Sequence, residues 1–187
     1  LAGNPETLNV RPFSVDTVHP SVTSSYPANT ETSVPQDPSF SVTFSEPMNL
    51  ATVTANTSDT TCSGYGIQVS KSSSFVDCVQ MSSAPYASNT NRTFTFFPNA
   101  NLDNETVYYL KATNSTKDFA GNQLVPEKTI SFTTVDVTRP VLTQVTAVST
   151  PTNNRTPSYS FRSSEAGTIS YGGSCGSSTS TITANTD

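Results

Sequence analysis

The chain has 187 residues and a formal net charge of −5, with 33% hydrophobic residues, 12% charged residues and no Trp. Because it has no cluster of Lys or Arg to hold a phosphate backbone, we expect no nucleic-acid partner. No stretch approaches the roughly 20 apolar residues of a membrane helix, so we expect no membrane span in this fragment. Short runs of aromatic and β-branched residues recur, which favours a folded β protein over a disordered chain.

Segments that alternate apolar and polar residues follow one another along most of the chain. Such alternation is typical of strands with one buried face. Clusters of Pro, Asn, Asp, Ser and Gly lie between the segments and predict turns. The strands predicted in this way are 21–26, 39–44, 66–69, 76–81, 93–96, 107–112 and 129–132. About seven short strands in two antiparallel sheets predict an all-β, immunoglobulin-like (Ig-like) β-sandwich.

One segment of the sequence occurs twice. Leu1-Ala2-Gly3-Asn4 is followed by Phe13-Ser14-Val15-Asp16, and Phe119-Ala120-Gly121-Asn122 is followed by Phe132-Thr133-Thr134-Val135-Asp136. Two matches in the same order, with a period of about 118 to 120 residues, indicate a tandem array of domains.

The repeat divides the chain into three parts. We expect residues 1–15 to be the last strand of a preceding Ig-like domain and residues 16–135 to be one complete domain. Residues 136–187 are then the incomplete N-terminal half of a following domain. An unfinished sheet has an unpaired edge, so we expect this half to be completed by another chain or to be poorly ordered.

The complete domain carries a series of ordered motifs. It opens with residues 27–35 and with Val42-Thr43-Phe44-Ser45-Glu46-Pro47-Met48-Asn49, and it closes with Phe97-Pro98, Leu102, Tyr108, residues 118–122 and residues 132–134. This order resembles the bacterial Ig-like domain known from surface-layer proteins. Residues 138–175 resemble the start of a different bacterial Ig-like repeat. The resemblance implies an extracellular stalk-like or adhesive role in a bacterial envelope protein, and no catalysis.

Three cysteines are present. Cys62 and Cys78 flank a predicted strand, and a bridge between them would close a loop of about 15 residues. Because an exported chain meets oxidising conditions, we predict this disulfide. Cys175 is left over and is expected to be free or cross-linked between molecules. A zinc site is disfavoured, because His19 is the only histidine and no Cys-x-x-Cys pair occurs.

Nothing in the sequence predicts an enzyme. His19 lies in a linker beside Pro20, and no nucleophile motif accompanies it. No Asp or Glu falls in a motif that suggests paired carboxylates for glycoside chemistry.

Acidic residues are predicted to gather at one pole of the sandwich. In Ig order, the entering linker, the loop after the second strand and the loop before the last strand share one end, which brings Asp16, Glu46 and Asp118 together. Such a group would suit calcium, and Asp136 with Glu165 could repeat it at the next junction. Alternatively, Glu46 accepts hydrogen bonds from its own loop and Asp118 begins an Asx-type turn.

The leading functional prediction is a structural or adhesive spacer at the bacterial cell surface, with neighbouring Ig-like domains as its partners. One alternative is a module that binds carbohydrate or a host protein, for which Tyr65 and Tyr86 are the candidate exposed rings. Another is an accessory domain of a secreted enzyme.

Overall fold

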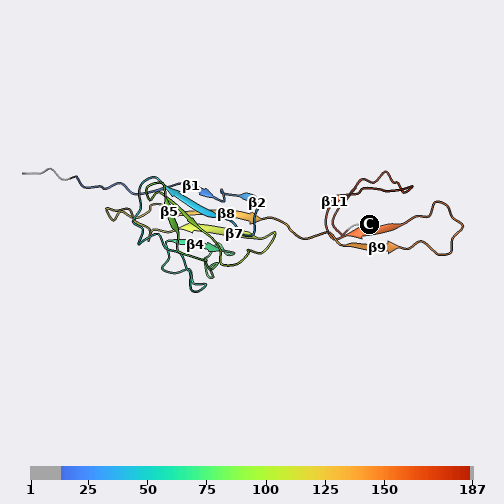
Figure 1. Cartoon of the computed structure of the whole chain (residues 1–187), viewed down its shortest axis with the longest axis horizontal. Helices are drawn as coiled ribbons and strands as arrows, with labels where there is room; N and C mark the ends of the chain where they lie inside the picture. Colours follow the sequence, from blue (N-terminus) through green and yellow to red (C-terminus); the bar gives the residue numbers. More distant parts are fainter. Residues whose placement is uncertain (1–13, 186–187) are drawn as a thin grey trace, which may run out of the picture. The chain divides into compact units, whose positions relative to one another are not determined.

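The computed structural model describes residues 14–185, in two compact units (Figure 1). Unit 1 ends at Asp136 and unit 2 begins at Val137. All regular elements in the described range are strands, which confirms the all-β prediction. Because this range contains no helix, it holds no helix that could cross a membrane. The strand predicted from residues 1–15 falls almost wholly outside the described residues.

Over its described residues, 14–136, unit 1 contains eight strands in two sheets. The strands are β1 (Val22–Tyr26), β2 (Glu31–Val34), β3 (Phe40–Phe44), β4 (Ile67–Ser70), β5 (Tyr86–Ser88), β6 (Thr93–Phe96), β7 (Val107–Ala112) and β8 (Lys128–Thr134). One sheet has the order β1-β3-β6-β5 and the other β2-β8-β7-β4. All neighbouring strands are antiparallel except β2 and β8, which run parallel. The unit is therefore the predicted Ig-like sandwich with one parallel pair.

One predicted strand is wrong. Residues 76–81 form no strand, because their backbone groups bond in turn to different segments instead of to one partner. The N–H of Cys78 donates to the carbonyl of Thr60 at 2.7 Å, and the N–H of Val79 donates to that of Val69 at 2.7 Å. The segment thus closes a loop beside β4 without forming a ladder.

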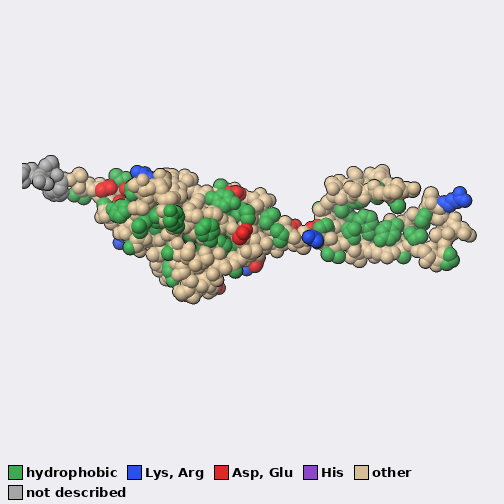
Figure 2. Space-filling model, viewed as in Figure 1, with side chains coloured by type: hydrophobic (Ala, Val, Ile, Leu, Met, Phe, Trp, Pro, Cys, Tyr) green, Lys and Arg blue, Asp and Glu red, His purple; other side chains and the backbone are tan. Residues whose placement is uncertain are grey.

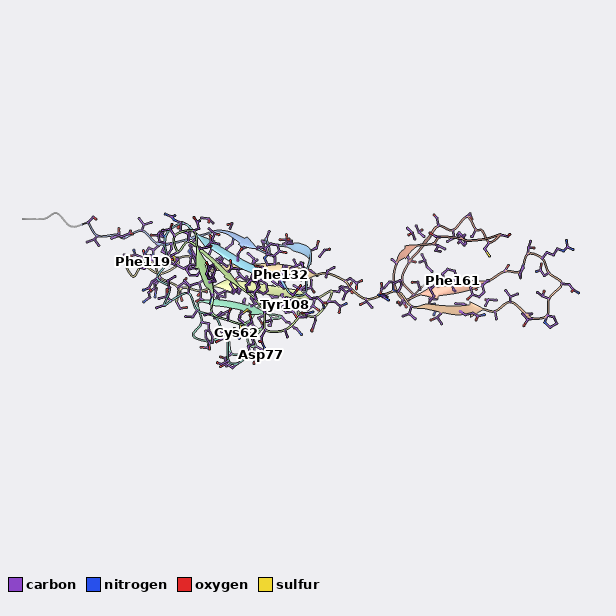
Figure 3. All side chains as sticks on the ribbon, viewed as in Figure 1. Cys62, Asp77, Tyr108, Phe119, Phe132 and Phe161 are labelled. Carbon is purple, nitrogen blue, oxygen red and sulfur yellow. A yellow bond between two sulfur atoms is a disulfide. The ribbon has the colours of Figure 1, made fainter. Side chains whose placement is uncertain are left out.

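The core lies between the two sheets and is rich in aromatic rings. Strand β3 buries every second residue, as its alternation predicts. The ring of Phe132 stacks on that of Tyr108 (Figure 3), with 5.7 Å between centroids. It also packs edge-to-face with the ring of Phe40 at a centroid distance of 5.7 Å. Burying such a side chain contributes roughly 1.5–3 kcal/mol, so these rings stabilise the sandwich strongly.

An insert, formed by residues 60–64 and 72–78, covers the outer face of β4. All four residues of this strand are buried, including Gln68 and Ser70, which point away from the core. The hydroxyl of Ser70 donates to the carbonyl of Asp77 at 2.6 Å. A disulfide joins Cys62 to Cys78, with 5.2 Å between their Cα atoms, and ties the two halves of the insert together.

The chain enters and leaves unit 1 at opposite ends (Figure 1). At the entry end, the N–H of Val125 donates to the carbonyl of Pro20 at 3.4 Å. Strand β8 follows, and its seven residues span about 23 Å before the chain leaves the unit.

The described residues of unit 2, 137–185, form two small sheets. Strand β9 (Leu142–Thr146) pairs with β10 (Ser160–Ser163), and β11 (Gly167–Thr168) pairs with β12 (Thr181–Ile182). Of its described residues only Ser163 is buried, and apolar side chains are open to solvent (Figure 2). Its completion by another chain stays a prediction.

Candidate functional site

Three carboxylates meet at the entry end of unit 1. Asp16 belongs to the entering linker, Glu46 to the loop after β3, and Asp118 to the loop between β7 and β8. One oxygen of each lies within 4.8 Å of the others. The structure therefore brings together the three residues that strand order had suggested.

Backbone pairing between two loops holds this group in place. Met48 forms a β-bridge with Asp118, and the N–H of Asn49 donates to the carbonyl of Lys117 at 2.8 Å. The loop after β3 is thereby fixed beside the loop after β7. Glu46 and Asp118 consequently lie together although 72 positions separate them in the sequence.

Asp118 is the buried member of the group, with 2% of its surface exposed. Its Oδ1 accepts the backbone N–H of Asn122 at 2.8 Å, and its Oδ2 accepts the side-chain amide of Asn122 at 2.7 Å. Burial acts to raise the pKa of Asp118, but hydrogen bonds from Asn122, Gly121 and Ala120 hold that pKa below its usual value. Asp118 therefore stays ionised, and the predicted Asx-type turn is present.

The repeated Phe119–Asn122 motif forms the turn around Asp118. Gly121 has φ +95, a conformation that favours glycine. The side-chain amide of Asn122 also donates to the carbonyl of Asp16 at 3.2 Å, which links the turn to the entering linker. Asn122 is a functional candidate that sequence reasoning missed, although the repeat already marked its position.

Glu46 lacks a hydrogen-bond partner at one oxygen. Among the described residues, its Oε1 is the only buried side-chain nitrogen or oxygen atom without one. Burial, followed by the negative charges of Asp16 and Asp118, raises the pKa of Glu46, and Arg92 and His19 oppose this rise. The alternative in which the loop's own N–H groups satisfy Glu46 does not hold for Oε1.

Two basic residues lie near the group and carry no sequence motif. The guanidinium of Arg92 donates to the carbonyl of Ser45, next to Glu46. The Nδ1 of His19 lies 2.9 Å from the carbonyl oxygen of Gln123, which helps to dock the linker. Even with these basic side chains nearby, three close carboxylates and an unpartnered oxygen form an arrangement suited to a hard cation such as calcium.

The second predicted acidic pair stays a prediction. Asp136 is exposed at the end of unit 1. Glu165 is partly buried in unit 2, where its N–H donates to the hydroxyl of Ser163 at 3.3 Å.

The two tyrosines proposed for ligand binding differ in exposure. Tyr86 lies on the edge strand β5 and is 71% exposed. Tyr65 precedes β4 and is partly buried, and its carbonyl accepts the side-chain amide of Gln68 at 3.2 Å. Cys175 is exposed and has no disulfide partner within the described residues.

The sequence of the sandwich matches a known protein family over almost its whole length. Residues 16–134 match the family of bacterial Ig-like domains. The chain belongs to this family. The match covers the whole span from the acidic linker to the end of β8, and it confirms the resemblance that the ordered motifs indicated.

Solved structures similar to this bacterial Ig-like domain include surface-layer proteins. The structure of surface layer protein SbsC, domains 1–6, is 19% identical, with a TM-score of 0.44, and the match covers 68% of this chain. The N-terminal part of the bacterial S-layer protein SbsC is also 19% identical, with a TM-score of 0.43. This chain spans 15% of the first structure and 26% of the second. No curated protein matches the chain.

Proposed function

We propose that the chain is a non-catalytic structural segment of a bacterial cell-surface protein, in which tandem Ig-like domains act as a stalk or spacer. The observation that carries this proposal is the path of the chain, which enters unit 1 at one end and leaves at the other around a filled core. Domains with this path can be joined in a line. The repeated segment and the membership of the bacterial Ig-like family support the same role.

A domain exchange in the full-length protein tests the spacer role. Residues 16–135 would be replaced by an unrelated β-sandwich of equal length, and a deletion of the same residues would serve as the comparison. If the domain is a spacer, the exchange should leave the part of the protein farther from the cell as accessible to added protease on intact cells as it is in the parent. The deletion should make that part less accessible. Loss of surface presentation after the exchange would contradict the spacer role.

The proposal includes calcium at the entry end. Support comes from the 4.8 Å grouping of Asp16, Glu46 and Asp118 and from the unpartnered Oε1 of Glu46. Calcium takes six to eight oxygen ligands, so carbonyl groups or water would complete the set. Since Asp16 lies in the linker, an ion here would fasten the linker to the sandwich and stiffen the junction.

Thermal unfolding with and without calcium tests the site. At a calcium concentration 100 times Kd, binding to the folded state alone adds about 2.7 kcal/mol. We expect a chelator to remove this gain and Glu46→Gln to abolish it. The raised pKa of Glu46 means that its charge opposes folding at neutral pH, an effect that fades as pH falls through the folded pKa. In calcium-free buffer at pH 7, Glu46→Gln should therefore be at least as stable as the parent.

Glu105→Gln is the matched control for the calcium experiment. Glu105 is exposed at the exit end, where its N–H donates to the carbonyl of Val135 at 3.2 Å. This variant should keep the full response to calcium. A calorimetric titration of the parent without binding heat, together with a melting temperature that a chelator leaves unchanged, would refute the site.

Ligand binding is a second candidate function, favoured by the outer face of the sheet β1-β3-β6-β5. None of these four strands contains a charged residue. Hydroxyl-bearing residues face outward across β3 and β6, where the hydroxyls of Thr43 and Thr93 lie 3.0 Å apart, and the exposed ring of Tyr86 lies at the edge. Uncharged hydroxyls beside an exposed ring suit a neutral carbohydrate.

A glycan array tests this second candidate. The ligand-binding function predicts that the chain binds neutral glycans and that Tyr86→Ala abolishes this binding. Tyr65→Ala should leave the binding unchanged, because Tyr65 is partly buried. An array without signal would remove this candidate. An accessory role beside a secreted enzyme stays a prediction that the sequences flanking this chain would decide.

A further inference from the structure

The parallel pair β2–β8, the one such pair among the described strands of unit 1, joins an early strand of the unit to its last. Glu31 of β2 lies opposite Phe132 of β8, and Val34 lies opposite Thr134. A backbone hydrogen bond closes each end of the pair. One joins Thr30, just before β2, to Ser131 of β8, and the other joins Val135, just after β8, to Val34 of β2.

These end bonds are short and well placed. The N–H of Val135 donates to the carbonyl of Val34 at 2.7 Å. At the opposite end, the N–H of Thr30 donates to the carbonyl of Ser131 at 2.7 Å, and the N–H of Ser131 donates to Oδ1 of Asn29 at 3.0 Å. The bonds therefore bracket the pair on both sides.

The path of the chain decides how tension acts on this pair. The chain enters unit 1 near Val125, where β8 is about to begin, and leaves beyond the end of β8. A pull on the two ends of the unit therefore draws β2 and β8 in opposite directions along their own length. In this shear direction all hydrogen bonds of the pair share the force, whereas a pull on two adjacent ends would break them one after another.

The entering strand is anchored in both sheets. Strand β1 pairs with β3 in one sheet, and the chain then continues into β2, which pairs with β8 in the other. Tension from the entry end must therefore release β1 from β3 before or together with the release of β2 from β8. Both pairings protect the aromatic core between the sheets.

We propose that unit 1 is a tension-resistant domain and that the parallel pair β2–β8 is its mechanical clamp. The inference rests on the proposed role as a segment of a stalk, because only a domain joined at both ends carries tension. It goes beyond that role, since a spacer could equally be compliant. The clamp also assigns a function to the one strand pair that departs from the antiparallel pattern.

The disulfide supplies an internal marker for a pulling experiment. Cys62 and Cys78 are 16 positions apart, so their bond keeps roughly 50 Å of chain from extending. Unfolding of unit 1 releases a certain contour length, and this length should be roughly 50 Å greater after the disulfide is reduced. This difference identifies the unfolding event of unit 1. Unfolding of unit 2 should not show this change.

Single-molecule force spectroscopy of the full chain tests the clamp. All chains would carry Cys175→Ser, so that handles attach only at chosen positions. One set is pulled from the two termini, and the other from Asp37→Cys and Val137→Cys, which lie just beyond the same ends of β2 and β8. We expect a clearly higher unfolding force from the termini. Equal or lower force in that direction would overturn the proposal.

Variants of the pair sharpen the test. Val135→Pro removes the N–H that bonds to Val34, and Val137→Pro places the same residue in the linker as a control. We expect Val135→Pro to lower the force from the termini and Val137→Pro to leave it unchanged. If Val135→Pro fails to fold, Asn29→Ala replaces it as the test. This variant removes only the side-chain oxygen that accepts the N–H of Ser131, and it should also lower the force from the termini.

The result is independent of the surface role. The clamp is refuted if the unfolding force does not depend on pulling direction, or if Val135→Pro and Asn29→Ala leave that force unchanged. In either case the domain exchange on cells can still support a spacer. A direction-dependent force in a protein that is not presented at the surface would instead refute the proposed function and leave the clamp in place.

Discussion

The two units consist of similar short strands rich in Ser and Thr, yet they bury very different amounts of apolar surface. Unit 1 places β3 and β6 of one sheet against β7 and β8 of the other, and Phe132 is 1% exposed between them. Unit 2 pairs its strands only two by two, and Leu142 of β9 is 64% exposed. Alternation makes a strand, but only a second sheet turns its apolar side into a core.

This difference has an energetic consequence. Ordering one residue costs roughly 1–2 kcal/mol of backbone entropy, and burial of apolar surface is the main term that offsets this cost. Two-stranded sheets are marginally stable on their own in water. We therefore expect unit 1 to account for the cooperative unfolding of the chain, and matched substitutions in the two units test this.

The largest effect is expected from a core aromatic ring. Phe132→Ala removes a ring that touches both Tyr108 and Phe40 and should destabilise unit 1 by about 3–5 kcal/mol. Phe161→Ala, its partner change on β10 of unit 2, should shift the same urea unfolding curve by no more than about 0.5 kcal/mol. Similar losses for both variants would mean that unit 2 has a core of comparable importance.

The cysteines give the next largest contrast. Replacing Cys62 and Cys78 together by Ala opens a loop of about 15 residues and should cost about 3 kcal/mol on the chain-entropy model. Cys175→Ser changes an exposed residue of unit 2 and should leave the urea midpoint unaltered. An unchanged midpoint in the double variant would show that the insert does not contribute to the stability of the sandwich.

Much of the sandwich was predictable because its central strands carry a strong local pattern. The alternation of β3, β6, β7 and β8 reflects one buried and one solvated face, so it appears in the sequence itself. Strand β2 carries no such pattern, because Thr30 and Ser33 adopt φ values of 64 and 58 and only two of its residues pair with β8. Strand β5 has three residues, too few for a period.

The candidate site was predictable in part for a different reason. Asp16, Glu46 and Asp118 could be placed at one end from the order of strands alone, without knowledge of side-chain contacts. Hydrogen bonds across loops could not be placed in this way. Asn122 reaches both Asp118 and Asp16, and Arg92 bonds beside Glu46, only because distant loops fold against each other.

A smaller effect is expected from one buried hydroxyl group. The hydroxyl of Tyr108 accepts the backbone N–H of Asp103 at 3.0 Å, and Tyr108→Phe would leave that N–H without its acceptor. We expect a loss of about 1 kcal/mol in urea unfolding. Tyr171→Phe removes a hydroxyl that donates to the carbonyl of Thr179 in unit 2, and it should cause no measurable loss. Equal effects would place the two tyrosines in equivalent environments, contrary to their burial.

The smallest effect concerns a carboxylate at the surface of unit 1. The N–H of Asn114 donates to Glu127 at 3.0 Å and holds the pKa of Glu127 below its usual value, helped by Lys111, whose Nζ lies 3.0 Å from the other oxygen. A lowered pKa stabilises the fold above the ordinary value of 4.5, and this stabilisation is lost as pH falls through the folded pKa.

Glu127→Gln should therefore cost less than about 1 kcal/mol at pH 7, because both side chains of the ion pair are partly solvated. The difference from the parent should shrink as urea unfolding is measured at pH values progressively below 4.5. Glu165→Gln, the matched change in unit 2, should leave the unfolding of unit 1 unaltered at every pH. A cost for Glu127→Gln that persists unchanged in acid would assign its effect to lost packing instead of lost charge, since the parent carboxyl is then neutral as well.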